Sequence, residues 1–95
     1  MLIEFYYSMT KTIELIGYAG NIDILKQLYN SRKFYTQLEN AIKVSGRILS
    51  KRLKELIDGD LINRKLMENR RVVYSITEKG KRVIEKLQEI EKLDD

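Results

Sequence analysis

Three basic side chains recur along one short stretch, at a spacing that would place them on one face of a helix. Arg47, Lys51 and Lys54 follow Ser45, and at about 100° per residue they fall opposite the leucines of the same stretch. Guanidinium and ammonium groups donate hydrogen bonds to phosphates and to the O6 and N7 atoms of guanine. This face, with Ser50 beside the cations, therefore predicts contact with a polyanion such as a nucleic acid.

The opposite face of the same helix is apolar. Three leucines recur at i, i+4 and i+7 and predict its buried side: Leu49, Leu53 and Leu56. Ser45 is the expected N-cap of a helix that runs from Gly46 to about Asp58. Gly59 follows this helix, and we expect it in the left-handed conformation that ends many helices.

Two shorter helices are predicted ahead of the cationic one. The first has Asn21 as its expected N-cap and runs to about Asn30, and the second runs from about Thr36 to Lys43. Residues 31–34 between them form a turn or one short strand. The side chains expected to be buried on the first helix are Ile22, Leu25, Leu28 and Tyr29.

A β-hairpin and a final helix are predicted after the cationic helix. The strands span Leu61 to Met67 and Val72 to Ile76, with alternating apolar residues on the second and a polar tip at residues 68–71. Thr77 is the expected N-cap of the last helix, which covers residues 77–93. The apolar side of that helix is expected to include Val83, Leu87 and Ile90.

The N-terminal segment, residues 1–18, has an apolar pattern that suits pairing between helices. Spacings of 4, 3, 4 and 3 form a heptad-like seam from Leu2, Tyr6, Met9, Ile13 and Ile16. A strand over residues 2–7, followed by a helix from Ser8 or Thr10, is the alternative. In a chain of 95 residues this seam and the one on the last helix have little to pack against. We therefore expect a homodimer in which both seams are buried.

Composition narrows the chemistry that this chain can perform. Its 95 residues suit a single domain. The sequence has neither cysteine nor histidine, so disulfides, thiol nucleophiles, the usual general base and the commonest metal ligand are all missing. No catalytic constellation or phosphate-binding glycine loop is present. We expect a protein that is not an enzyme and that holds no cofactor or metal.

Positive charge is concentrated in the middle of the chain. Residues 31–82 hold fourteen Lys and Arg against six Asp and Glu, whereas residues 1–30 and 83–95 are each mildly acidic. Such a concentration of positive charge produces an electrostatic field that attracts a polyanion. No apolar run approaches the ~20 residues that span a bilayer, and residues 1–7 lack the basic cluster of a signal peptide. We expect a soluble cytoplasmic protein with no membrane partner.

The order of elements and several motifs resemble those of the winged helix-turn-helix regulators, most closely the HxlR-type group, with the MarR, ArsR and PadR groups as neighbours. The matching motifs are Phe34-x-x-x-Leu38, Val44-Ser45, Leu49-x-x-x-Leu53-x-x-Leu56, Asp58-Gly59-Asp60-Leu61-Ile62-x-Arg64 and Val73-x-Ser75-Ile76-Thr77-Glu78-Lys79-Gly80. The resemblance covers roughly residues 12 to 90. It implies a mainly α fold with a small β-hairpin, in which residues 35–58 are the helix-turn-helix and residues 61–76 the wing. HxlR-type proteins often carry a cysteine near the N-terminus, and its absence here excludes a cysteine-based signal.

The resemblance also implies roles for the polar residues. The second helix of the motif enters the major groove in such proteins, so Arg47 and Ser50 would reach base edges while Lys51 and Lys54 pair with phosphates. The expected contacts of the wing are Arg64, Lys65, Asn69, Arg70 and Arg71. Those expected to meet a phosphate at the start of the first motif helix are Arg32, Lys33, Thr36 and Gln37. Tyr35 could stack on a base.

We therefore predict a homodimeric transcriptional regulator, and the resemblance implies a repressor that binds specific double-stranded DNA. A winged helix used for protein–protein contact and an architectural protein that coats DNA without sequence preference are the alternatives. No residue indicates a small-molecule effector, although the tyrosines near the expected dimer seam could line a pocket for one.

Overall fold

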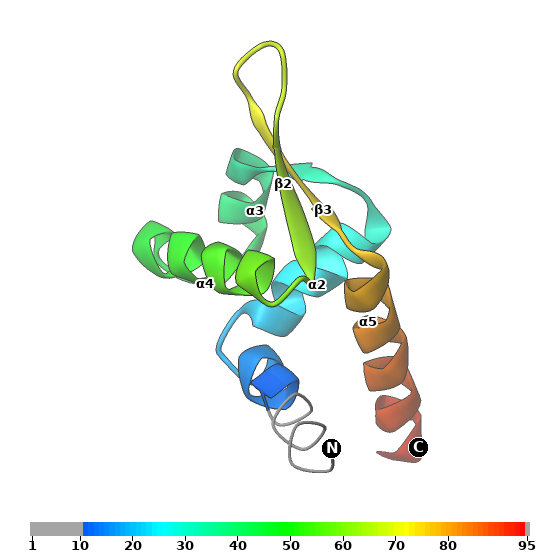
Figure 1. The fold of residues 1–95 in the computed structure, drawn as a ribbon. Helices are drawn as coiled ribbons and strands as arrows, with labels where there is room; N and C mark the ends of the chain where they lie inside the picture. Colours follow the sequence, from blue (N-terminus) through cyan, green and yellow to red (C-terminus); the bar gives the residue numbers. More distant parts are fainter. Residues whose placement is uncertain (1–10, 95) are drawn as a thin grey trace.

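The computed structural model describes residues 11–94, and its elements follow the predicted order (Figure 1). After a helical segment at residues 11–16, the elements are α2 (Asn21–Asn30), β1 (Lys33–Phe34), α3 (Tyr35–Ala41), α4 (Gly46–Asp58), β2 (Ile62–Leu66), β3 (Val72–Ile76), α5 (Glu78–Glu91) and the 3-10 turn η1 (Lys92–Asp94). Among these, α4 has the predicted bounds, whereas α3 ends two residues before the predicted Lys43.

The three strands form one antiparallel sheet in the order β1-β3-β2. The hairpin register pairs Ile62 with Ile76 at its base and Leu66 with Val72 near its tip. The strand alternative for residues 31–34 is confirmed, because Lys33 pairs with Tyr74. Beyond Ile62 every residue of β2 is exposed, so the hairpin extends away from the body as a wing (Figure 1).

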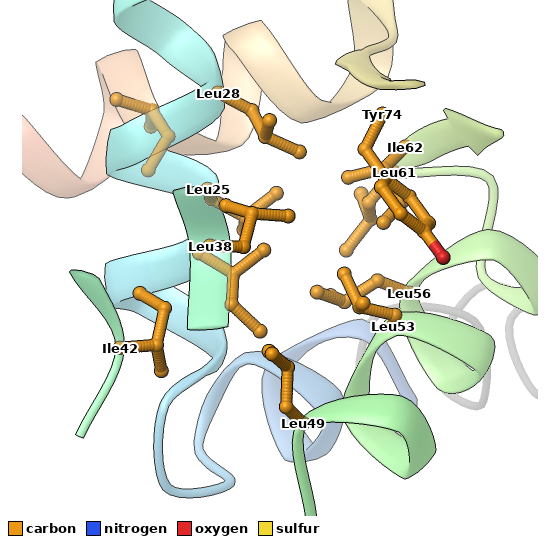
Figure 2. Close-up of a cluster of buried hydrophobic side chains, with 12 residues drawn as sticks. Leu25, Leu28, Leu38, Ile42, Leu49, Leu53, Leu56, Leu61, Ile62 and Tyr74 are labelled. Atoms are coloured by element: carbon orange, nitrogen blue, oxygen red, sulfur yellow. The ribbon is translucent and has the colours of Figure 1, made fainter. Parts of the chain in front are cut away.

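The core lies where α2, α3, α4 and the base of the hairpin meet (Figure 2). All three predicted leucines of α4 are buried there. Side chains from the other elements complete the cluster: Ile24, Leu25, Leu28, Leu38, Ile42, Leu61, Ile62, Tyr74 and Ile84. On β3, Val72 and Ile76 pack against the same cluster as Tyr74, which confirms the predicted alternation. This packing holds α4 by its apolar face and anchors the base of the wing next to it.

The start of α2 differs from the prediction. Its N-cap is Gly20, in the left-handed conformation with φ 88°, and Asn21 is the first helical residue. Asn21 is fully buried, and its Nδ2 donates a hydrogen bond to the carbonyl oxygen of Leu15 at 2.6 Å. It therefore ties α2 to the preceding helical segment. The buried side of α2 includes Ile24, while the predicted Tyr29 is 37% exposed and Ile22 only half-buried.

The end of α4 also corrects the prediction for Gly59. This glycine has φ −83°, and the left-handed conformation falls on Asp60, with φ 61°. A Cβ at residue 59 would lie 2.6 Å from Cδ2 of Leu15, the far end of a side chain that can shift. The close approach shows that residues 11–16 pack against the end of α4.

The last helix, α5, is joined to the core mainly through its first turns. Thr77 is its N-cap, as predicted: its Oγ1 accepts from the Gly80 amide at 3.0 Å and donates to the Asp60 carbonyl at 2.7 Å. Ile84, not one of the predicted residues, is the buried hydrophobic of this helix. The later turns run down and away from the sheet (Figure 1).

Candidate nucleic-acid interface

The polar face of α4 is exposed to solvent. All four residues predicted to contact DNA are exposed: Arg47, Ser50, Lys51 and Lys54. Within residues 11–94, none of the three cations forms an ion pair with a carboxylate. The leucines on the opposite face are at most 2% exposed. A rigid helix thus presents unpaired positive charge to solvent.

The first turn of α4 is fixed by its cap. Ser45 has extended backbone angles, and its Oγ accepts a hydrogen bond from the amide of Ile48 at 3.2 Å. Such a cap satisfies a backbone donor that the helix cannot satisfy itself. The predicted cap is confirmed, and it fixes the start of the helix two residues before Arg47.

Arg52, a fourth cation of α4, is turned inward. Its Nη1 lies 2.7 Å from Oε1 of Glu55, and its guanidinium carbon lies 4.6 Å from the centroid of the Tyr18 ring. The side chain is only 13% exposed. Arg52 therefore connects α4 to the segment that precedes α2. Its guanidinium is not exposed for contact with a ligand. The i,i+3 spacing of Arg52 and Glu55 was the one sequence signal for this pairing.

Tyr35 is placed at the junction of the two motif helices. It begins α3, is half-buried, and its hydroxyl lies 3.4 Å from the Gly46 carbonyl oxygen and 3.2 Å from Oγ of Ser50. No sequence pattern indicates this contact, because it joins residues eleven and fifteen positions apart. In the structure the hydroxyl of Tyr35 is directed at α4.

The wing carries its charge along β2 and at the tip. Arg64, Lys65, Asn69, Arg70 and Arg71 are all exposed. The turn is held by Oδ1 of Asn69, which accepts from the Arg71 amide at 3.1 Å, and Arg70 takes the left-handed conformation with φ 65°. The guanidinium carbon of Arg71 lies 3.6 Å from the centroid of the Phe34 ring. This stacking joins the wing to the strand before α3.

The four residues expected at the start of α3 are not equivalent. Arg32 and Thr36 are exposed and have no hydrogen bond or ion pair within residues 11–94. Oε1 of Gln37 accepts from the Phe34 amide at 2.8 Å, so Gln37 caps α3 instead of leaving that amide open. Lys33 donates to the Ser31 hydroxyl. Arg32 and Thr36 are thus the two side chains here that remain open to a ligand.

Apolar side chains remain exposed at the end of the molecule opposite the wing. Ile13, Ile90 and Leu93 are 58%, 59% and 83% exposed, on the first described helical segment and on the last turns of the chain (Figure 1). The other predicted seam residues, Ile16, Val83 and Leu87, pack in part against the core. Leu2, Tyr6 and Met9 lie outside the described residues.

Carboxylates outnumber cations in residues 83–95, on the later turns of α5 and beyond. Glu85 accepts a hydrogen bond from the Tyr29 hydroxyl at 3.2 Å, and this bond together with the nearby carboxylate charge raises the pKa of Tyr29. Lys86 pairs with Glu89 at 3.5 Å, and Lys26 of α2 pairs with Glu91 at 3.6 Å. The cations near α5 are therefore partly neutralised, unlike Arg47, Lys51 and Lys54 of α4.

The described part of the chain has neither a membrane-spanning helix nor a cluster of metal-binding side chains. No helix within residues 11–94 is long and apolar enough to cross a membrane. The same part of the chain contains no group of three or more acidic, His or Cys side chains that could hold a metal ion.

Comparison with known families identifies the fold. The model of the family described as HxlR-like helix-turn-helix matches residues 15–95. The chain belongs to the HxlR-like helix-turn-helix family. Its resemblance to this family, read from the motifs around α4 and the wing, is therefore confirmed, as is the winged-helix fold.

Relatives of this HxlR-like protein support the same assignment. The uncharacterized HTH-type transcriptional regulator YvaP of Bacillus subtilis (strain 168) is 34% identical over 85 residues, which cover 86% of this chain and 79% of YvaP. The reduced form of the transcriptional regulator YodB from B. subtilis superposes with a TM-score of 0.81 at 28% identity, covering 88% of this chain and 85% of YodB. A structure assigned to the MarR family, from Enterococcus faecalis, has a TM-score of 0.85 at 22% identity, covering 94% and 84% of the two chains. At that identity the last match concerns the fold alone.

Proposed function

We propose that this HxlR-like protein is a cytoplasmic transcriptional regulator without catalytic activity, which binds double-stranded DNA as a homodimer and represses by occupying the DNA that polymerase needs. The observation that carries the proposal is the exposed, unpaired cationic face of α4 on a fully buried row of leucines. Relatives named as transcriptional regulators support it.

The side chains of α4 divide by their position along the helix. Arg47 and Ser50 lie in its first turns, the part of a recognition helix that meets base edges. Lys51 and Lys54 lie further along, where their charge would pair with phosphates. Arg47 would donate to O6 and N7 of guanine, a contact worth ~1–3 kcal/mol of discrimination when bidentate.

The wing would add contacts beside the recognition helix. Arg64, Lys65 and Arg70 are exposed and unpaired within residues 11–94. Arginine is attracted to the negative potential of a narrow minor groove, so Arg70 at the tip is the residue we assign there. Arg71 would position the wing through its stacking on Phe34. Arg32 and Thr36 would meet a phosphate beside α3.

A homodimer would cover the apolar residues left exposed at the end opposite the wing. Ile13, Ile90 and Leu93 are large and more than half exposed, which is unfavourable in water. Pairing two copies through a two-fold axis buries each patch against its equivalent. The acidic residues of α5 then lie away from the DNA. The two copies of α4 would address half-sites about one helical turn, ~34 Å, apart.

Selection of bound sequences from random duplexes tests this proposal. We expect enrichment of an inverted repeat whose half-sites lie 10–10.5 base pairs apart or a multiple of that spacing, about 10³-fold or more above random DNA. Binding without any enrichment would favour an architectural protein. An absence of binding at low salt would favour a module for protein–protein contact.

A further inference from the structure

The hydroxyl of Tyr35 lies between a backbone carbonyl and a side chain of the recognition helix. It is 3.4 Å from the carbonyl oxygen of Gly46 and 3.2 Å from Oγ of Ser50. Tyr35 is half-buried at the start of α3, whereas Ser50 is exposed on the DNA-facing side of α4. The Tyr35 hydroxyl thus connects α3 to Ser50 of α4, a residue that we assign to base contact.

The protons of this group can be placed by counting donors. A carbonyl oxygen only accepts, and a tyrosine or serine hydroxyl has a single proton to donate. Both contacts of Tyr35 can form at once only if its proton points to Gly46. The Ser50 proton must then point to the Tyr35 oxygen. The Ser50 oxygen then has only lone pairs left toward solvent, so on that side it can accept a hydrogen bond but not donate one.

We infer that Tyr35 is a positioning residue that fixes Ser50 as a hydrogen-bond acceptor toward the major groove, an inference that rests on the proposed DNA binding. A free serine hydroxyl can contact either kind of base edge. A serine held as an acceptor selects a base with an exocyclic amino group in the major groove. Those are adenine, through N6, and cytosine, through N4.

Selection from random duplexes with the wild type and three variants measures this preference. In the wild type we expect one position of each half-site to hold adenine or cytosine, preferred about five- to tenfold, as one hydrogen bond allows. Ser50→Ala should remove the preference at that position only. Tyr35→Phe, which keeps the ring and frees the serine proton, should admit guanine and thymine there. Tyr29→Phe, which removes an α2 hydroxyl bonded to Glu85 of α5 and to neither motif helix, should change nothing.

Several outcomes would overturn the inference. Identical preferences for the wild type and Tyr35→Phe at the position that Ser50→Ala affects would show that the phenol does not orient the serine. A wild-type preference for guanine or thymine at that position would show that Ser50 donates. A Ser50→Ala variant with every preference intact would show that Ser50 reads no base.

A second measurement tests the hydrogen bond without DNA. In a double-mutant cycle on the free protein, Tyr35→Phe and Ser50→Ala should be coupled by about twofold or more in the unfolding equilibrium constant. No coupling would contradict the contact itself. If the coupling is present and the wild type enriches no duplex, the proposed function fails and the base preference fails with it.

Discussion

The helices α4 and α5 are built alike and are used differently. Each has 13 or 14 residues and a hydroxyl N-cap, Ser45 or Thr77. The apolar face of α4 is buried along its whole length, whereas α5 buries Ile84 and leaves Ile90 59% exposed. The polar face of α4 carries unpaired cations, while that of α5 mixes cations with carboxylates, several of them in ion pairs.

This difference shows how one amphipathic pattern can serve two partners. A helix whose apolar face is satisfied within its own chain can offer only its polar face to another molecule, and the cations of α4 suit a polyanion. A helix with an exposed apolar end needs a further apolar surface, which a second copy of the chain would provide in the proposed homodimer. The account therefore predicts separable effects for substitutions on the two helices.

The largest effect is expected from the buried face of α4. Leu53→Ala should lower the free energy of unfolding by about 2–5 kcal/mol, because it leaves a cavity in a packed core. Lys54→Ala, on the adjacent exposed position, should change it by less than about 0.5 kcal/mol. Urea denaturation followed by circular dichroism measures both. Equally small changes in the free energy of unfolding would mean that the leucine face of α4 is not packed in the core.

The exposed end of α5 should control association. Ile90→Ala removes an apolar side chain from each of two copies, so we expect the dimer to weaken by about 2–4 kcal/mol. Lys86→Ala, on the polar face of the same helix, is the control and should leave the dimer intact. Analytical ultracentrifugation across micromolar concentrations measures both. A wild type that sediments only as a monomer would remove the two-fold arrangement.

Within the free face of α4, the residues should differ in what they recognise. Arg47→Ala should reduce discrimination between the selected site and a single-base variant by about 1–3 kcal/mol. Lys54→Ala should weaken binding to both duplexes by the same factor. Fluorescence anisotropy with the two duplexes provides the comparison. If both substitutions weaken binding to the two duplexes by the same factor, Arg47 does not make the base contact.

The two N-caps give the smallest predicted difference. Ser45→Ala should destabilise the protein by about 1 kcal/mol, the usual cost of losing a cap. Thr77→Ala should cost more, because Thr77 also donates to the Asp60 carbonyl at 2.7 Å, a contact that joins α5 to the end of α4. Thermal unfolding of both variants tests the order. The reverse order would show that the Asp60 contact adds no stability.

The sequence predicts α4 well because its signals are local. The leucine spacing, the Ser45 cap and the cations all act within one helix, so its bounds and its two faces could be worked out without the tertiary fold. The wing is predictable for the same reason, from the alternating apolar residues of its second strand and the polar tip before them. In both regions the polar residues singled out from sequence are exposed in the structure.

The features that could not be predicted depend on distant parts of the chain. Arg47 and Arg52 are the same residue type on one helix, yet Arg52 turns inward because Tyr18 lies beside it. Gly59 lies against Leu15, a residue more than forty positions earlier in the chain. Tyr35 reaches Ser50 only because α3 and α4 meet at the angle that the core sets. Spacing within a helix carries no information about these contacts.

The salt dependence of DNA binding tests the central claim most directly. The logarithm of affinity falls with the logarithm of salt concentration by about 0.9 for each phosphate contact. In the double variant Lys51→Ala with Lys54→Ala, the slope should decrease by about 0.9 for each lysine lost from each copy of the dimer. A matched double variant of α5, Lys86→Ala with Lys92→Ala, should keep the wild-type slope. Equal slopes for the wild type and both double variants would show that the cationic face of α4 does not meet the DNA backbone.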